Sequence, residues 1–205
     1  MSRPSVEFLR YLLRLRGAET TLTAAESRWL ITCARGSRYV VEVGVYEGAT
    51  SARLAAAIEP SGRLWLIDPY FRHTRPERLL GFSFSRFIAR RSVRPWAHRV
   101  RFVLRTSIAA ANEIVLDPPA DLIFVDADHS YPAVRADFLA WAPHLAPAGI
   151  IAFHDSRCCP ARPDLDAATG PVRLVDEILR GDHGPWSLAG QADSIAAFRR
   201  TGAGG

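Results

Sequence analysis

The chain has 205 residues, of which 48% are hydrophobic and 23% charged, so it can bury one core and is too short to need a second domain. Its net charge is +5, but all 26 Lys and Arg positions are arginines scattered along the sequence, so we expect no nucleic-acid partner. No apolar run approaches the roughly 20 residues of a membrane span, and we expect neither a membrane partner nor a signal peptide. Three cysteines without disulfide or zinc spacing favour a reducing, cytoplasmic location.

Two helices are predicted at the start of the chain. Apolar residues recur at helical spacing over residues 5–16, and the sequence TAAE at 23–26 is typical of a capping box that opens a second helix ending near Arg35. We assign residues 1–36 to these N-terminal helices. They would form either a dimer surface, which would make the protein a homodimer, or a lid over a pocket.

Residues 37–200 show the pattern of a parallel sheet with helices on both faces. Five short apolar runs, each separated by enough residues for a crossover helix, are predicted strands: 39–43, 63–67, 99–104, 121–125 and 149–153. A helix at 172–181 and a two-stranded hairpin follow, which predicts an α/β fold whose last strand runs antiparallel. We expect residues 201–205 to be a disordered tail.

A glycine-containing turn joins the first predicted strand to a helix that begins near Thr50 or Ser51. Gly44 suits a backbone conformation closed to other residues, and Gly48 lets the backbone approach a ligand. Asp68 follows the second strand twenty residues after Gly48, where a carboxylate can accept both hydrogen bonds of a ribose diol. Together these features favour a nucleotide site over a solvated loop and an unrelated acid.

The turn does not match the dinucleotide fingerprint. Tyr46 occupies the position two residues after Gly44, where that fingerprint has a glycine. Glu47 lies where a helix N-terminus would otherwise receive a pyrophosphate, and a carboxylate there repels phosphate. It tolerates the ammonium and sulfonium of S-adenosylmethionine, so a nicotinamide-dependent oxidoreductase is the less favoured alternative.

The sequence EVGVYEGATS at 42–51 resembles the first motif of the class I S-adenosylmethionine-dependent methyltransferases, and Asp68 is similar to their ribose-binding acid. The resemblance runs from about Tyr39 to Arg200 and implies a Rossmann-like, doubly wound sheet of seven strands, mostly parallel with an antiparallel last strand. It places Thr106 and Ser107 near the adenine and Glu42 near the methionine half of the donor. The implied donor-binding residues are Glu42, Gly44, Tyr46, Glu47, Gly48, Thr50, Ser51, Asp68, Pro69, Thr106, Ser107 and Asp126.

Polar residues also follow the fourth and fifth predicted strands. Asp126 comes directly after the first of these strands, and His154 and Asp155 come directly after the second. Ligands of doubly wound sheets bind beyond the carboxyl ends of the strands, so these residues converge if the strands are neighbours. Asp126 and Asp155 would then offer oxygen ligands to a shared divalent ion such as Mg²⁺.

The segments FVDADHSY at 124–131 and AFHDS at 152–156 resemble the metal-dependent small-molecule O-methyltransferases, which include catechol, caffeoyl-coenzyme A and macrolide-sugar enzymes. The resemblance implies Asp126, His154 and Asp155 as metal ligands, and the histidine makes Mn²⁺ an alternative to Mg²⁺. His129 stands where the antibiotic-sugar enzymes carry a histidine proposed as general base, so we expect His129 and Asp126 to be catalytic. The alternative is a solvated loop in which Ser130 or Asp128 caps the next helix.

We therefore expect a methyltransferase that moves the methyl group of S-adenosylmethionine to a hydroxyl oxygen of a small-molecule acceptor. A protein that binds the donor without turnover is the alternative, because a fold alone does not establish chemistry. Residues 69–99 are predicted to form an amphipathic helix, or else Tyr70, Phe71 and Arg72 wall the acceptor pocket. The adjacent cysteines at 158–159 are expected to be inert.

Overall fold

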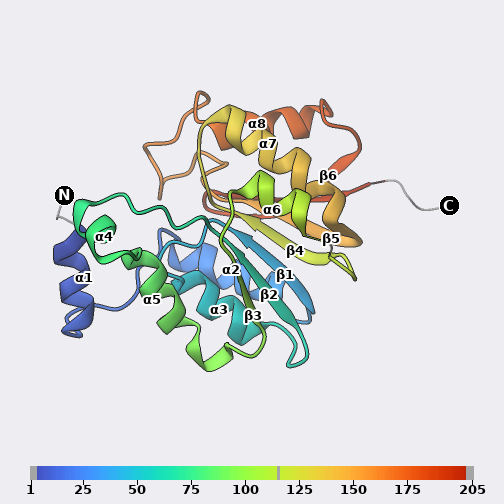
Figure 1. The fold of residues 1–205 in the computed structure, drawn as a ribbon. Helices are drawn as coiled ribbons and strands as arrows, with labels where there is room; N and C mark the ends of the chain where they lie inside the picture. Colours follow the sequence, from blue (N-terminus) through green and yellow to red (C-terminus); the bar gives the residue numbers. More distant parts are fainter. Residues whose placement is uncertain (1–3, 115, 202–205) are drawn as a thin grey trace.

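The computed structural model describes residues 4–114 and 116–201, so most of the predicted tail lies outside the described residues. One seven-stranded sheet forms the centre, in the order β3-β2-β1-β4-β5-β7-β6 (Figure 1). Strands β1 to β5 are parallel, and β7 runs antiparallel between β5 and β6. The predicted α/β, Rossmann-like fold class is confirmed. The strands are β1 (Tyr39–Val43), β2 (Arg63–Ile67), β3 (Val100–Val103), β4 (Ala120–Val125), β5 (Leu145–Phe153), β6 (Trp186–Ala192) and β7 (Ile195–Arg200).

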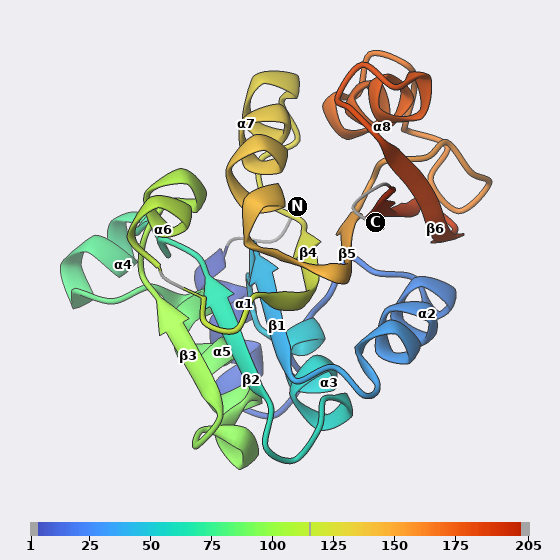
Figure 2. The ribbon, with the colours of Figure 1, turned by 90° about the vertical axis from the view of Figure 1, so that its right-hand side faces the viewer.

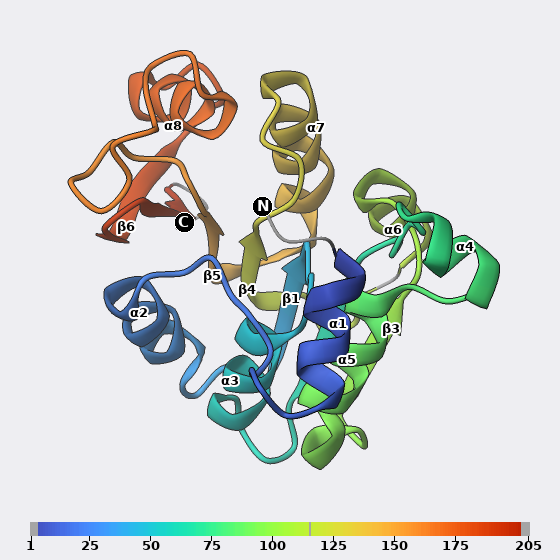
Figure 3. The same cartoon turned by 90° about the vertical axis from the view of Figure 1, so that its left-hand side faces the viewer.

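Helices cover both faces of the sheet (Figures 2 and 3). One layer contains α2 (Ala24–Ala34), α3 (Ala49–Ala57) and α5 (Phe84–Ser92), and the other contains α6 (Ser107–Glu113), α7 (Tyr131–Trp141) and α8 (Gly170–Arg180). The outlying helix α1 (Pro4–Leu12) lies beside α5, where the rings of Phe8 and Phe84 stack with centroids 4.2 Å apart. The short helices are α4 (Arg75–Leu80), η1 (Arg94–Trp96) and η2 (Ala142–His144).

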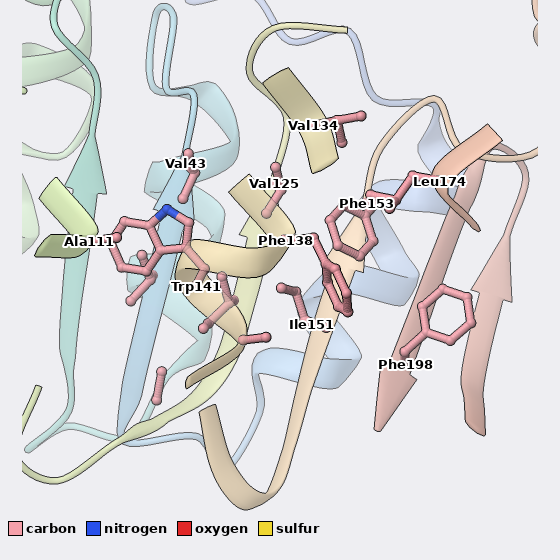
Figure 4. Packing of buried hydrophobic residues seen from close by; sticks show 14 of the residues in the cluster. Val43, Ala111, Val125, Val134, Phe138, Trp141, Ile151, Phe153, Leu174 and Phe198 are labelled. Carbon is pink, nitrogen blue, oxygen red and sulfur yellow. The ribbon is translucent and has the colours of Figure 1, made fainter. Parts of the chain in front are cut away.

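Alternating side chains on the strands divide the apolar core between the two faces. Successive residues of a strand point to opposite faces, so Val40 packs toward α2 and α3 while Val41 packs toward α6 and α7. Figure 4 shows the cluster on the side of α6, α7 and α8, in which Phe138 of α7 lies beside Phe153 of β5 and Trp141 of α7 lies beside Ala111 of α6. Each such side chain contributes about 1.5–3 kcal/mol when fully buried. Parallel pairing of β4 with β5, which sets Val125 opposite Phe153, brings the carboxyl ends of both strands to the same edge.

The segment from 69 to 99 departs from its prediction as one amphipathic helix. It contains α4 and α5, separated because Gly81 takes a left-handed conformation with φ +77° and Ser83 caps the next helix. The single-helix prediction is therefore wrong. The first predicted helix is also shorter than expected and ends at Leu12, whereas the capping box of Thr23 and Glu26 is present as predicted. Within the described ranges, no helix has the length and apolar character needed to cross a membrane.

Candidate active site

A cavity of about 1290 Å³ opens at the carboxyl ends of β1, β2, β4 and β5. Typical small-molecule sites enclose roughly 300–1,000 Å³, so this cavity has room for a donor and an acceptor together. Most of the predicted donor-binding residues line it: Glu42, Gly44, Tyr46, Thr50, Asp68, Pro69, Thr106, Ser107 and Asp126.

Three predicted donor residues, Glu47, Gly48 and Ser51, are not part of that lining. The Glu47 carboxylate turns to Arg16, whose Nη1 and Nη2 donate to its two oxygens at 2.6 and 2.7 Å. Ser51 is fully buried, and its hydroxyl donates to Glu42 at 2.5 Å. The side chains of Glu47 and Ser51 therefore stabilise the turn from the side that faces away from the cavity.

The two glycines of the turn have different reasons to be glycine. Gly44 has φ +87°, and a Cβ built on it would lie 1.9 Å from the backbone oxygen of Asp126. The turn after β1 and the loop after β4 are therefore in direct contact. Gly48, with φ +72°, would place its Cβ 2.9 Å from Cα of Ala89 in α5, so it allows helix packing here instead of the approach to a ligand that its position suggested.

Asp68 organises the same turn through its carboxylate. One oxygen accepts hydrogen bonds from the amides of Val45 and Tyr46 at 3.1 and 3.2 Å, and the other accepts the amide of Tyr70 at 2.7 Å. A carboxylate has about four acceptor positions, so capacity remains for a ribose hydroxyl. Tyr46 and Tyr70 both have positive φ, 53° and 49°, which is rare for bulky residues and concentrates at functional sites.

Glu42 presents a neutral carboxyl group at the base of the cavity. Burial raises the pKa of Glu42 to about 8, although the hydrogen bond from Ser51 acts in the opposite direction. The carboxyl group is therefore mostly protonated at pH 7 and can donate a hydrogen bond.

Asp126, His129 and His154 form a cluster in which one ligand atom from each lies within 4.8 Å of the others. Oδ1 of Asp126 is 3.3 Å from Nε2 of His129 and 3.1 Å from Nδ1 of His154. Burial acts to raise the pKa of Asp126, but the two imidazoles outweigh it and hold that pKa below its usual range. The hydrogen bond with Asp126 raises the pKa of His129 above its usual value.

The predicted metal ligand Asp155 is close to this cluster but engaged elsewhere. Its Oδ1 accepts hydrogen bonds from the guanidinium of Arg162 and from the hydroxyl of Ser194. The same oxygen is 3.4 Å from Nε2 of His154, and Oδ2 is 3.8 Å from Nδ1 of His129. To share an ion with Asp126, Asp155 would therefore have to bind it through Oδ2 or release Arg162 from Oδ1.

The chain between α1 and α2 contributes cavity residues that the sequence analysis missed. Glu19, Thr20 and Thr21 line the cavity. The hydroxyl of Thr20 is 2.9 Å from that of Thr50, and the hydroxyl of Thr21 lies 3.5 Å from Asp126. This connection starts beside α5 and ends at α2 (Figure 3), and no pattern in its sequence signals a binding role. Within the described part of residues 1–36, only this connection, and no residue of α1 or α2, lines the cavity, so the dimer surface and the lid both stay predictions for this segment.

The remaining walls come from the segment between β2 and α4, from α5, α6 and α7, and from the loop after β5. The alternative prediction for residues 69–99 is that Tyr70, Phe71 and Arg72 wall the acceptor pocket. Tyr70 and Phe71 line the cavity, but Arg72 does not. Asp128 also lines it, and its carboxylate accepts the amide of Ser130, the residue that precedes α7; neither Asp128 nor Ser130 caps the helix through its side chain, so the predicted capping role is wrong. Further lining residues that the sequence did not indicate are His73, Ser85, Ile108, Ala133, Ala136, Asp137 and Arg162.

A family model described as "Methyltransferase domain" matches residues 41–156, which is more than half of the chain. The chain belongs to this family. The matched segment contains the glycine turn, Asp68 and the cluster of Asp126, His129 and His154, and it confirms the predicted enzyme class at the level of the family. The uncharacterized protein y4gI of Sinorhizobium fredii is 29% identical over 133 residues, which is 62% of this chain and 14% of that protein. The chain thus matches about one seventh of this relative's length.

Solved methyltransferase structures share the fold over almost the whole chain. The O-methyltransferase TomG of Streptomyces achromogenes, in complex with S-adenosylmethionine, has a TM-score of 0.64 and 19% identity, with 98% of this chain and 92% of that chain covered. The Bacillus cereus O-methyltransferase, in complex with S-adenosylhomocysteine, has a TM-score of 0.65 and 18% identity, with coverages of 98% and 93%. A Corynebacterium glutamicum protein reaches 0.67 at 18% identity, with coverages of 97% and 90%. At these identities the likeness shows the fold.

Proposed function

We propose that this protein transfers the methyl group of S-adenosylmethionine to a hydroxyl oxygen of a small molecule, with a divalent ion at the ends of β4 and β5. The observation that carries the proposal is the meeting of two elements in one cavity. The glycine turn with Asp68 lies at one side, and Asp126 and His129 line the other, with the third member of their cluster, His154, buried behind them. Gly44 and Asp126 are in backbone contact, so the two sites adjoin.

The donor side suits a cationic nucleoside without phosphate. Asp68 retains acceptor capacity for the ribose, and Glu42 offers a protonated carboxyl group near the predicted methionine end. Thr106 and Ser107, at the start of α6, line the part of the wall where we place the adenine. Carboxyl groups outnumber arginines in the lining, which favours the sulfonium and ammonium of the donor over a phosphate.

The residues at the ends of β4 and β5 fit a divalent ion that accepts both nitrogen and oxygen ligands. Nδ1 of His154 faces Oδ1 of Asp126 at 3.1 Å, and the buried Nε2 on the other side of the ring faces carboxylate oxygens of Glu26 and Asp155, each at 3.4 Å. We propose Asp126 and His154 as ligands, and an imidazole nitrogen beside a carboxylate suits Mn²⁺ better than Mg²⁺. When bound, such an ion would acidify the acceptor hydroxyl and orient its oxygen.

His129 is the member of the cluster best placed to accept the acceptor's proton. The His129 side chain is 43% exposed and lines the cavity. Its Nε2 lies 3.3 Å from Oδ1 of Asp126, which orients the ring. Methyl transfer is an in-line displacement at carbon, so the remaining work of the protein is alignment of sulfur, methyl and oxygen and exclusion of water. The walls from Phe71, Tyr46 and the 19–21 connection supply the exclusion.

Methyl transfer from isotope-labelled S-adenosylmethionine to a panel of catechols, phenols and sugars tests the proposal, with an amine panel as the contrast. We expect label in at least one hydroxyl acceptor, loss of turnover in excess chelator, and recovery with Mn²⁺ or Mg²⁺. Label only in amines would contradict an oxygen acceptor. Full turnover in chelator, with no metal found by elemental analysis, would contradict the role of the ion.

A further inference from the structure

Glu26 has more contacts than its capping box requires. Its Oε2 accepts the amide of Thr23 at 2.7 Å, which closes the box. Its Oε1 accepts the amide and the hydroxyl of Ser194 at 2.9 and 2.5 Å, so Glu26 also ties α2 to the turn between β6 and β7. The side chain is completely buried.

The same carboxylate faces the active-site histidine. Oε2 of Glu26 lies 3.4 Å from Nε2 of His154, whose side chain is 1% exposed. The opposite ring nitrogen, Nδ1, lies 3.1 Å from Oδ1 of Asp126. The imidazole therefore spans two carboxylates, one from the N-terminal helix α2 and one from the end of β4.

A charge buried this deeply needs a partner of opposite or adjustable charge. A glutamine also completes a capping box, so helix capping alone does not call for a carboxylate here. Asp155 approaches Nε2 at the same 3.4 Å, but its oxygen is also bonded by Arg162 and Ser194. Glu26 has no arginine contact among the described residues, which leaves His154 as its partner.

We propose that Glu26 is a positioning residue of the methyl-transfer site, which holds the His154 ring at Nε2 so that Nδ1 is directed at Asp126. The nitrogen that an imidazole offers to a site is set by the contact of its other nitrogen, and such supporting carboxylates orient metal-binding histidines. The inference rests on the proposed function in that Asp126 and His154 are assigned to that site. It extends the site to α2, outside the segment that the family model matches.

The chain contains a matched control in Glu77. This residue closes the same type of box, accepting the amide and hydroxyl of Thr74 at 2.9 and 2.8 Å. It also accepts the amide of Phe84 at 2.8 Å and is buried, so it repeats the pattern of Glu26 with Thr23 and Ser194. Among the described residues, its side chain accepts hydrogen bonds from Thr74 and Phe84 and from no histidine.

The test compares Glu26→Gln with Glu77→Gln in the full chain. Thermal melting follows the fold, electron paramagnetic resonance follows Mn²⁺ binding, and nitrogen-15 spectra of histidine-labelled protein follow the His154 ring, assigned with a His154→Asn variant. We expect Glu26→Gln to shift the His154 ring signals, to weaken Mn²⁺ binding about 10–100-fold and to lower kcat while the KM for the donor stays within about threefold. Glu77→Gln should change the melting temperature and none of these.

Unchanged His154 signals in a folded Glu26→Gln variant, with Mn²⁺ binding within about twofold of the parent, would overturn the inference. If the glutamine variant does not fold, Glu26→Asp is the second variant, because it keeps the charge but withdraws it from the ring; unchanged His154 signals there would overturn the inference equally. A parent that binds no Mn²⁺ and transfers no methyl group would refute the proposed function. The ring signals would still decide whether Glu26 holds His154.

Discussion

Removing the ion pair of Arg16 and Glu47 should release the connection that walls the donor side of the cavity. The pair is bidentate, with nitrogen–oxygen distances of 2.6 and 2.7 Å, and its side chains are only 10% and 5% exposed. Glu47 also accepts the amide of Glu19, which itself lines the cavity. The pair therefore anchors the segment that carries Thr20 and Thr21 to the cavity wall.

The expected magnitude follows from the burial of the pair. Exposed pairs contribute about 0.2–1 kcal/mol, whereas loss of one partner of a buried pair costs about 3–5 kcal/mol. The connection can detach locally, which limits the loss to the free energy of that opening. For Arg16→Met and Glu47→Gln, we expect a coupling free energy of at least about 2 kcal/mol in a double-mutant cycle of unfolding.

Hydrogen exchange and donor titration complete the assay. Amides of residues 17–22 should exchange faster in both single variants, and donor affinity should fall because part of the wall is lost. If the pair acts through the wall, the double variant should bind the donor no worse than either single one. A coupling below about 0.5 kcal/mol would refute the anchor. A further loss on adding Glu47→Gln to Arg16→Met would instead return Glu47 to direct donor binding, as the sequence predicted.

Three further outcomes follow from the geometry of the site. Gly44→Ala should lower the free energy of unfolding by at least about 3 kcal/mol, because the added Cβ meets the Asp126 backbone. Gly36→Ala is the control, since Gly36 has φ +79° but open space around it, and it should cost about 1 kcal/mol. Equal losses in denaturant melts would show that the contact is unimportant. The folded-state pKa of Glu42 is raised from 4.5 to about 8, so the stabilising effect of its proton is fully present below pH 4.5 and is lost as the pH rises to 8. Across that window, the free energy of unfolding of the donor-free parent should fall by up to about 1.4 kcal/mol per pH unit relative to that of Glu42→Gln. Parallel pH profiles of the two proteins would contradict the shift. His129→Ala should lower turnover by roughly 10²–10⁴-fold with donor binding nearly intact, and turnover within about threefold of the parent at every pH would make His129 a loop residue.

Local signals in the sequence were enough to predict the sheet and both edges of the cavity. Strand periodicity located β1 to β5, and residues at strand ends, such as Asp68 and Asp126, lie beside the cavity because parallel strands place all their carboxyl ends on one side. The helical break at Gly81 was visible only as a glycine within an amphipathic pattern, and a glycine inside a helix looks the same in sequence as one that ends it.

Contacts between distant segments could not be predicted in this way. Glu47 and Arg16 are 31 positions apart, and Glu26 and Ser194 are 168 apart, so no spacing rule relates them. The sequence indicated that Glu47 lies beside a cation, and that cation is the guanidinium of Arg16 in this chain. Glu26 was predicted as a helix cap, which it is, and its second role depends on how α2 docks against β5 and the β6–β7 turn.

The central claim is that the turn around Asp68 binds S-adenosylmethionine. Asp121 is the matched control, since it also accepts two backbone amides, those of Arg38 and Tyr39, but lies at the opposite end of the sheet. Calorimetric titration of the parent, Asp68→Asn and Asp121→Asn with S-adenosylmethionine tests the claim most directly. We predict one site per chain, weakened by about 1.5–3 kcal/mol, or roughly 10–150-fold, in Asp68→Asn alone. A folded parent that binds no S-adenosylmethionine, or a folded Asp68→Asn variant with the affinity of the parent, would contradict it.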